Sequence, residues 1–119
     1  MSNEKFMCPM KFLSDRFGGK WKLPIICALS NKKPHRFSAI KRKLRYITST
    51  TLSITLKGLE AQGLVERTEF DEIIPHVEYA LTKKGVRVLP MLVNMVEWAA
   101  QEMGYEDIHT YCDECMKIS

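Results

Sequence analysis

The chain has 119 residues, of which 45% are apolar and 27% charged, a composition that excludes a disordered chain and fits one globular domain. No apolar stretch is long enough to span a membrane and no secretory signal begins the chain, so we expect a cytoplasmic protein. The net charge of +4 is unevenly distributed: residues 16–59 contain eleven Lys or Arg and no acidic residue, whereas residues 60–119 contain five basic and twelve acidic residues. Such a basic block is typical of a surface that binds a polyanion, although a merely solvated surface has the same pattern.

Three short helices are predicted in the first half of the chain. Residues 9–17 form an amphipathic helix that begins at a proline and stops before two glycines. Residues 21–29 form the second, because Pro24 falls in its first turn, where a missing N–H is tolerated. Ser38 is a suitable N-cap for the third helix, which extends to Leu44.

A fourth helix is predicted over residues 49–62, with Thr48 as its N-cap and Gly63 as its C′ residue. Its leucines recur with helical spacing and should face the core; they are Leu52, Leu56 and Leu59. Because only a short turn separates the third and fourth helices, the pair is interpreted as a helix-turn-helix.

The second half of the chain begins with two alternating segments, residues 64–70 and 77–81, which predict a β-hairpin. Thr82 then caps a long helix that extends to about Met103. The expected fold is therefore α+β, mainly α: a winged helix-turn-helix with an N-terminal helix and a long C-terminal dimerisation helix. We expect one domain over residues 1–119.

The outer face of the fourth helix carries short hydroxyl side chains, which suit base edges in the major groove, and Lys57, which suits phosphate. An ordinary Ser/Thr-rich surface is the alternative, and the neighbouring basic residues favour double-stranded DNA as the partner. The predicted DNA-binding residues are Arg36, Ser38, Lys41, Arg42, Lys43, Thr48, Ser49, Thr50, Thr51, Ser53, Lys57 and His76.

The wing is expected to contribute less to DNA binding than the helix. His76 and Arg67 could reach the backbone or the minor groove, but Glu69, Asp71 and Glu72 would repel phosphate. We expect His76 to serve the hairpin geometry or to make a weak phosphate contact.

The C-terminal helix is apolar on nearly all sides. One stripe can face the core of the domain, and in so small a protein a second stripe needs another chain to cover it. The alternative is a helix wholly buried in its own domain. We expect a homodimer that binds a pseudo-palindromic operator. The predicted interface residues are Phe12, Leu89, Leu92, Val93, Val96 and Trp98.

Two groups of cysteines leave alternatives open. Cys112 and Cys115, with His109 before them, have the spacing of metal ligands, but a single CxxC in a tail is a weak signal and we predict no metal. Cys8 precedes a helix start in a basic context that favours the thiolate form, so redox sensing and an inert structural role are both open. Cys27, among apolar neighbours, is interpreted as a small buried hydrophobic residue.

No enzymatic activity is predicted, because the chain has no phosphate-binding loop, no nucleophile elbow and no evident catalytic carboxylate pair. We expect no cofactor. Two alternatives to a DNA-binding regulator remain: a winged-helix protein-interaction module, and a metal or redox sensor that acts through Cys112 and Cys115.

Several motifs in order resemble the HxlR-type winged helix-turn-helix regulators: Cys8-Pro9, Gly19-Lys20-Trp21, Arg36-Phe37-Ser38, the leucine pattern from Leu52 to Arg67, and Val77 to Gly85. The similarity extends from about Cys8 to Trp98. It implies a dimeric transcription factor with a DNA-binding core at about residues 20–82 and dimer contacts from about residues 6–18 and 82–103. It also implies that Cys8 occupies the position at which some members sense a small electrophile or oxidant. The tail, residues 104–119, lies outside the resemblance.

Overall fold

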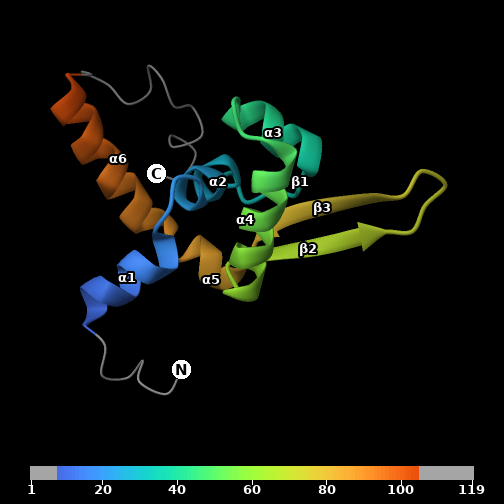
Figure 1. The fold of residues 1–119 in the computed structure, drawn as a ribbon, viewed down its shortest axis with the longest axis horizontal. Helices are drawn as coiled ribbons and strands as arrows, with labels where there is room; N and C mark the ends of the chain where they lie inside the picture. The colour runs from blue at the N-terminus through green and yellow to red at the C-terminus, as the bar shows by residue number, and fades with distance from the viewer. Residues whose placement is uncertain (1–7, 105–119) are drawn as a thin grey trace.

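The computed structural model describes residues 8–104, so His109, Cys112 and Cys115 lie outside the described residues. Within this range no helix combines the length and the hydrophobicity that crossing a membrane would require. The elements are α1 (Pro9–Phe17), α2 (Lys22–Ala28), β1 (His35–Arg36), α3 (Phe37–Leu44), α4 (Ser49–Ala61), β2 (Val65–Phe70), β3 (His76–Leu81), α5 (Lys83–Val86) and α6 (Leu89–Met103). In Figure 1, α1 and α6 lie at one end of the molecule and the β2–β3 hairpin projects from the other.

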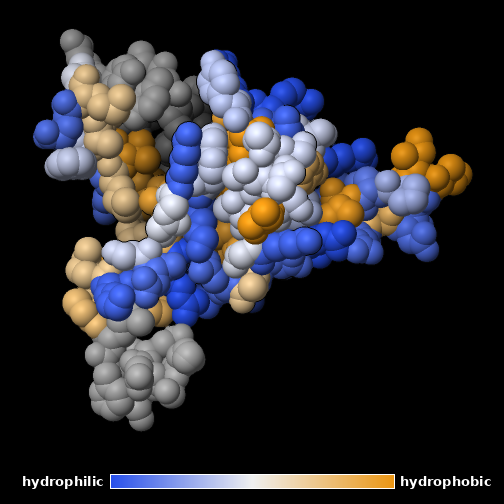
Figure 2. Space-filling model, viewed as in Figure 1, coloured by the Kyte–Doolittle hydropathy of each residue, from blue (hydrophilic) through white to orange (hydrophobic). Residues whose placement is uncertain are grey.

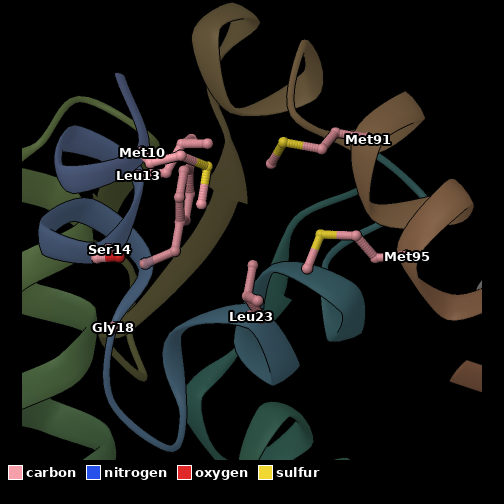
Figure 3. Close-up of a pocket in the computed structure, with 8 residues that line it drawn as sticks. Met10, Leu13, Ser14, Gly18, Leu23, Met91 and Met95 are labelled. Atoms are coloured by element: carbon pink, nitrogen blue, oxygen red, sulfur yellow. The ribbon is translucent and has the colours of Figure 1, made fainter. Parts of the chain in front are cut away.

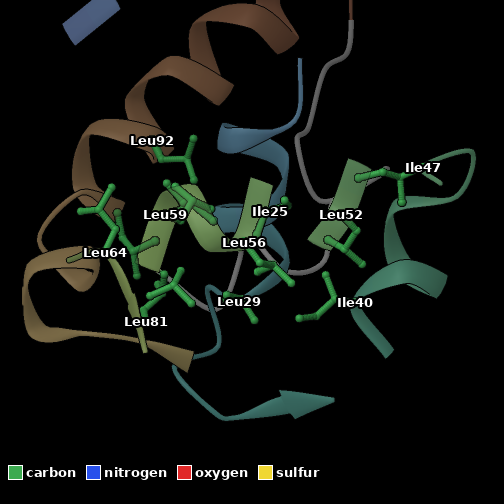
Figure 4. Packing of buried hydrophobic residues seen from close by; sticks show 13 residues of the cluster. Ile25, Leu29, Ile40, Ile47, Leu52, Leu56, Leu59, Leu64, Leu81 and Leu92 are labelled. Atoms are coloured by element: carbon green, nitrogen blue, oxygen red, sulfur yellow. The ribbon is translucent and has the colours of Figure 1, made fainter. Parts of the chain in front are cut away.

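The core forms around the inner face of α4. Leu52, Leu56 and Leu59 of this helix are at most 1% exposed, as the leucine spacing predicted. Figure 4 shows this cluster close to Ile25 of α2 and to Leu29, the residue after α2. Burying three leucines stabilises the fold by about 1.5–3 kcal/mol each, and it fixes which side of α4 remains outside.

The sheet has the order β1-β3-β2, and both pairings are antiparallel. The predicted hairpin is confirmed, with Val65 opposite Leu81 at its base and Phe70 opposite His76 near its tip. The short strand β1, in which His35 pairs with Tyr79, was not predicted. Two residues are too few to show the period of two that identifies a strand.

The start of α3 differs from the prediction. The helix begins at Phe37, one residue before the predicted cap Ser38, and Arg36 occupies the N-cap position with an extended backbone and without a side-chain capping bond. Because Arg36 is still part of β1, the strand itself provides the extended residue that normally precedes a helix. Ser38 therefore lies inside the first turn and is exposed.

The predicted long C-terminal helix is divided into two. Thr82 does cap α5, since its hydroxyl accepts a hydrogen bond from the Gly85 N–H (3.0 Å) and donates one to the Gly63 carbonyl (2.6 Å). However, α5 ends at Val86 and α6 begins at Leu89. Pro90 explains the break: it has no N–H to donate to the Val86 carbonyl four residues earlier, and its ring would clash with that carbonyl in a continuous helix.

Two helical glycines provide a test of the packing. A Cβ at Gly85 would lie 2.2 Å from the Leu64 carbonyl oxygen, whereas a Cβ at Gly58 would meet nothing within 4 Å. Gly85→Ala should therefore destabilise the protein by about 1–3 kcal/mol. Gly58→Ala should stabilise it by about 0.5–1 kcal/mol through helix propensity alone. Urea unfolding of both variants measures these changes, and shifts of the same sign would contradict the packing described here.

Candidate nucleic-acid interface

The first turn of α4 is fixed by its own hydroxyl side chains. The Thr48 hydroxyl oxygen accepts a hydrogen bond from the Thr51 N–H (3.1 Å), as predicted for an N-cap, and donates to the Thr51 hydroxyl (3.0 Å). Thr55 donates to the Thr51 carbonyl (2.8 Å). The hydroxyls of Thr48 and Thr51 are thus engaged within the helix, and they hold the start of α4 in one geometry.

The outer face of α4 carries the side chains that remain available to a ligand. Ser49, Thr50 and Lys57 are exposed and Ser53 is half-buried. Ile54 is 65% exposed and lies on the same face, although it is not among the predicted DNA-binding residues. At 100° per residue, positions 50 and 54 lie nearly opposite the leucine stripe, so a full helical projection would have identified it.

The basic residues before α4 differ in how accessible their side chains are to phosphate. Arg42 is exposed and Lys41 is half-buried, both on α3. Lys43 donates to the Ala28 carbonyl at the end of α2 (3.2 Å), so its ammonium group is engaged within the fold and the predicted phosphate contact is less available. Arg36 is exposed and pairs in the sheet with Glu78 of β3, which brings a carboxylate near it.

The turn between α3 and α4 has an unusual backbone. Arg45 (φ 50°) and Tyr46 (φ 33°) both lie in the left-handed region that favours glycine. Such residues cost of order 1–3 kcal/mol each when no glycine relieves them. Tyr46 is 94% exposed directly before the start of α4. Its position, where the resembled family often has a glycine, is a sequence signal for this backbone conformation, whereas no local pattern indicated its exposure.

In the wing, His76 and Arg67 face carboxylates of the same hairpin. His76 lies 2.9 Å from Glu78 and 3.7 Å from Glu72, and its ring stacks on Phe70. Arg67 is hydrogen-bonded to Glu69, which, with Tyr79, raises the pKa of Arg67 above its usual value. These contacts agree with the expected role of His76 in hairpin geometry.

The wing ends in two exposed isoleucines, Ile73 (100%) and Ile74 (77%), beside Asp71 and Glu72. Figure 2 shows the apolar area at the end of the hairpin, next to hydrophilic residues. An acidic and apolar tip is poorly suited to a phosphate backbone. The candidate interface is therefore limited to α4 and the basic residues of α3.

A second notable surface is an apolar groove of about 390 Å³ between α1 and α6. Figure 3 shows Met10 and Leu13 of α1 facing Met91 and Met95 of α6, with Leu23 of α2 between them. A second hollow of about 330 Å³ shares Leu23 and Met95 and continues along α6. This apolar groove lies at the end of the molecule opposite the wing.

The predicted interface residues fall into two groups. Leu89 and Leu92 are 1% and 4% exposed and belong to the protomer's own core, so their assignment to a dimer surface was wrong. The helical stripe that faces the core begins at Leu89, and because α6 is apolar on nearly all sides, hydrophobicity alone does not distinguish this stripe from the outer one. Phe12 (37%) and Trp98 (65%) are exposed, while Val93 and Val96 are half-buried.

Two cysteines are described and both are free thiols. Cys8 is exposed at the N-cap of α1, where its carbonyl accepts a hydrogen bond from the Phe12 N–H (3.0 Å). Cys27 is half-buried against the core, close to the predicted environment. Among residues 8–104 no group of His, Cys, Asp or Glu is arranged to hold a metal ion.

A helix-turn-helix whose second helix presents a polar outer face, followed by a β-hairpin wing, defines a winged helix-turn-helix regulator. Comparison with known proteins gives the family. Residues 16–107 match the model of the HxlR-like helix-turn-helix family, and the chain belongs to this family. It is a DNA-binding transcriptional regulator of the helix-turn-helix type and not an enzyme.

The similarity covers most of each protein. The uncharacterized HTH-type transcriptional regulator BH0655 of Halalkalibacterium halodurans is 44% identical over 96 residues, which cover 81% of this chain and 85% of the relative. A regulator of the same description from Methanothermobacter thermautotrophicus is 40% identical, with 90% and 81% covered. The solved structure of the redox regulator HypR in its reduced form is 33% identical, with a TM-score of 0.76, and 82% of this chain and 95% of that one are covered.

The N-cap of α4 can be tested without DNA. Thr48→Ala removes the acceptor of the Thr51 N–H and should lower the free energy of unfolding by about 1 kcal/mol. Thr50→Ala, two residues on and exposed, should change it by less than about 0.5 kcal/mol. Urea unfolding of the two variants checks the difference, and equal stabilities would show that the capping bond contributes nothing.

Proposed function

We propose that this regulator binds a pseudo-palindromic double-stranded DNA operator as a homodimer, with α4 of each protomer in the major groove. The observation that carries the proposal is the outer face of α4, on which Ser49, Thr50 and Lys57 are exposed while the leucines on the opposite face hold the helix in the core. Hydroxyl groups at the start of a helix reach base edges when the helix enters the groove by its N-terminus.

Affinity and specificity come from different residues in this arrangement. Arg42, Lys41 and Lys57 neutralise phosphates and supply the sequence-independent part of binding. Ser49, Thr50 and Ser53 contact bases. Thr48 and Thr51 position the helix start through their mutual hydrogen bonds, and backbone N–H groups there favour a nearby phosphate. Arg36, Lys43 and His76 contribute less, because they are engaged elsewhere or face carboxylates. Ser38 is exposed in the first turn of α3, outside α4, and has a minor role.

The apolar groove supports the homodimer. Met10 (66%) and Met95 (45%) are exposed and line this groove, and the half-buried Val96 lines the hollow that continues it along α6. Trp98 (65%) is exposed on α6 one turn after Met95, whereas Phe12 and Val93 do not line the groove. Contiguous exposed apolar side chains of this kind are typical of protein–protein interfaces. A two-fold dimer formed here leaves both α4 helices free, because the groove and α4 belong to different faces of the protomer.

DNA binding can be separated into its two components. Arg42→Ala should weaken binding to all duplexes by a similar factor and reduce the slope of log affinity against log salt by about one. Thr50→Ala should relax the choice of base at one position of each half-site, at a cost of about 1–3 kcal/mol on the preferred duplex. Fluorescence anisotropy over a salt series measures both. Binding that ignores the basic substitutions would favour a winged-helix protein-interaction module instead.

The dimer has its own test. Met95→Lys places a charge in the groove where an apolar partner surface would cover it, and the substitution should convert the protein from dimer to monomer. Ile73→Lys is the matched control, since Ile73 is fully exposed at the wing tip and should leave the dimer intact. Sedimentation equilibrium gives the masses; a wild-type monomer, or a Met95→Lys dimer of unchanged affinity, would exclude this interface.

A thiol response is a second candidate, favoured by the exposed Cys8 at the start of α1, two residues before the groove residue Met10. A solved relative, HypR, is described as a redox regulator. A peroxide would oxidise the Cys8 thiol to a sulfenic acid and be reduced to the alcohol or water. Oxidation of Cys8 occurs beside the proposed dimer surface. It would alter the packing of the two protomers and, as a result, the distance between their α4 helices.

This response predicts that mild peroxide changes DNA affinity in the wild-type protein and not in Cys8→Ser. Cys27→Ser is the control, because the half-buried Cys27 packs against the core and is less accessible to peroxide than Cys8. Cys27 also lines the second hollow, so the dimer mass and the DNA affinity of this variant before peroxide are compared with those of the wild type. Anisotropy titrations before and after peroxide treatment, followed by reduction with a thiol, check the prediction. Affinity that is indifferent to peroxide would remove Cys8 as the sensor and leave the DNA-binding proposal standing.

A further inference from the structure

One exposed aliphatic side chain stands in the middle of the proposed DNA-reading surface. Ile54 is 65% exposed on α4, and the other large apolar side chains exposed in the described range lie outside this helix. In Figure 2 the face over α4 is mainly pale or hydrophilic, with a small isolated apolar area. A single exposed isoleucine is common on protein surfaces. Whether the exposure of Ile54 indicates a binding role therefore depends on its position in the helix.

Helix geometry sets Ile54 beside Thr50. The two residues are four apart, so they occupy the same face one turn from each other, and both lie nearly opposite the buried Leu56 and Leu59. The Cα–Cβ bonds of a helix tilt toward its N-terminus, so the Ile54 side chain leans over the turn that contains Thr50. A hydroxyl group and an aliphatic group are thereby paired on the part of α4 nearest its N-terminus.

Gly58, one turn after Ile54, leaves this side chain uncovered. A side chain at position 58 would lean back toward Ile54 for the same geometric reason. A Cβ at Gly58 would meet nothing within 4 Å, so no contact within the protomer requires a glycine in the middle of this helix. The open flank allows a flat surface to approach Ile54 closely from outside.

The major groove has one apolar feature among its base edges, the C5-methyl group of thymine, and aliphatic side chains recognise it by contact. Isoleucine in a helix has one strongly preferred χ1 rotamer, so its methyl groups are held in place before binding. We propose that Ile54 contacts the C5-methyl group of one thymine in each half-site and is thereby a specificity-determining residue. The inference rests on the proposed entry of α4 into the major groove.

The experiment first selects preferred duplexes for the wild-type protein from a random-sequence pool. Each thymine of the selected operator is then replaced, one position at a time, by deoxyuridine, which removes the methyl group and keeps every hydrogen-bonding group. Affinities are measured by anisotropy for the wild-type protein, for Ile54→Ala and for the control Ile74→Ala. Ile74 is exposed at the wing tip, so this control removes the same aliphatic group far from α4.

The expected result is one thymine position per half-site at which deoxyuridine weakens wild-type binding roughly fourfold, as removal of one buried methyl group implies. Replacement in both half-sites should weaken binding on the order of tenfold or more. Ile54→Ala should bind the thymine and deoxyuridine operators equally at that position, and Ile74→Ala should behave like the wild type. Unfolding midpoints confirm that the variants are folded.

The possible failures are distinguishable. If a sequence is selected but Ile54→Ala weakens binding without changing sensitivity to any thymine methyl group, the thymine contact is wrong and the proposed function stands. The same conclusion follows if no deoxyuridine replacement affects the wild type. If no sequence is enriched from the pool, sequence-specific binding through α4 is itself excluded and the inference falls with it.

Discussion

The burial of one leucine stripe determines which face of α4 is exposed to a ligand. Leu52, Leu56 and Leu59 are packed against α2, and a rotation of α4 about its axis would expose them to water. Losing even one of these contacts would cost a large part of the 5–15 kcal/mol by which small domains are stable. The orientation of the outer face, with Thr50 and Ile54 at its centre, is therefore a consequence of core packing.

The distribution of charge then distinguishes the helix-turn-helix from the hairpin as a binding surface for phosphate. The basic side chains of the proposed interface lie on α3 and α4, whereas in the hairpin Arg67 pairs with Glu69, and His76 lies beside Glu72 and Glu78. A wing whose arginine is paired and whose tip carries carboxylates has little positive charge left for phosphate. In the proposed binding mode, most of the charge that favours phosphate therefore lies at the helix-turn-helix.

The sequence was sufficient wherever a local rule governs the structure. The N-cap Thr48, the C′ residue Gly63 (φ 78°) and the spacing of the leucines predicted α4 almost to the residue. It was insufficient where tertiary contacts decide. The lysine that caps α2, Lys43, is fifteen residues away from its acceptor in sequence, and β1 exists only because β3 pairs with it. The division at Pro90 was readable and was overlooked, since helical periodicity continues through it.

The break between α5 and α6 affects the distance between the two α4 helices in the proposed dimer. A continuous helix from Thr82 onward would transmit the direction of the hairpin base rigidly to the far end of the molecule. With α5 ending at Val86, the axis of α6 is instead set by Leu89 and Leu92 in the core. In the proposed dimer, the separation in base pairs between the two half-sites therefore depends on the packing of α6, and a change in that packing would alter it without altering α4.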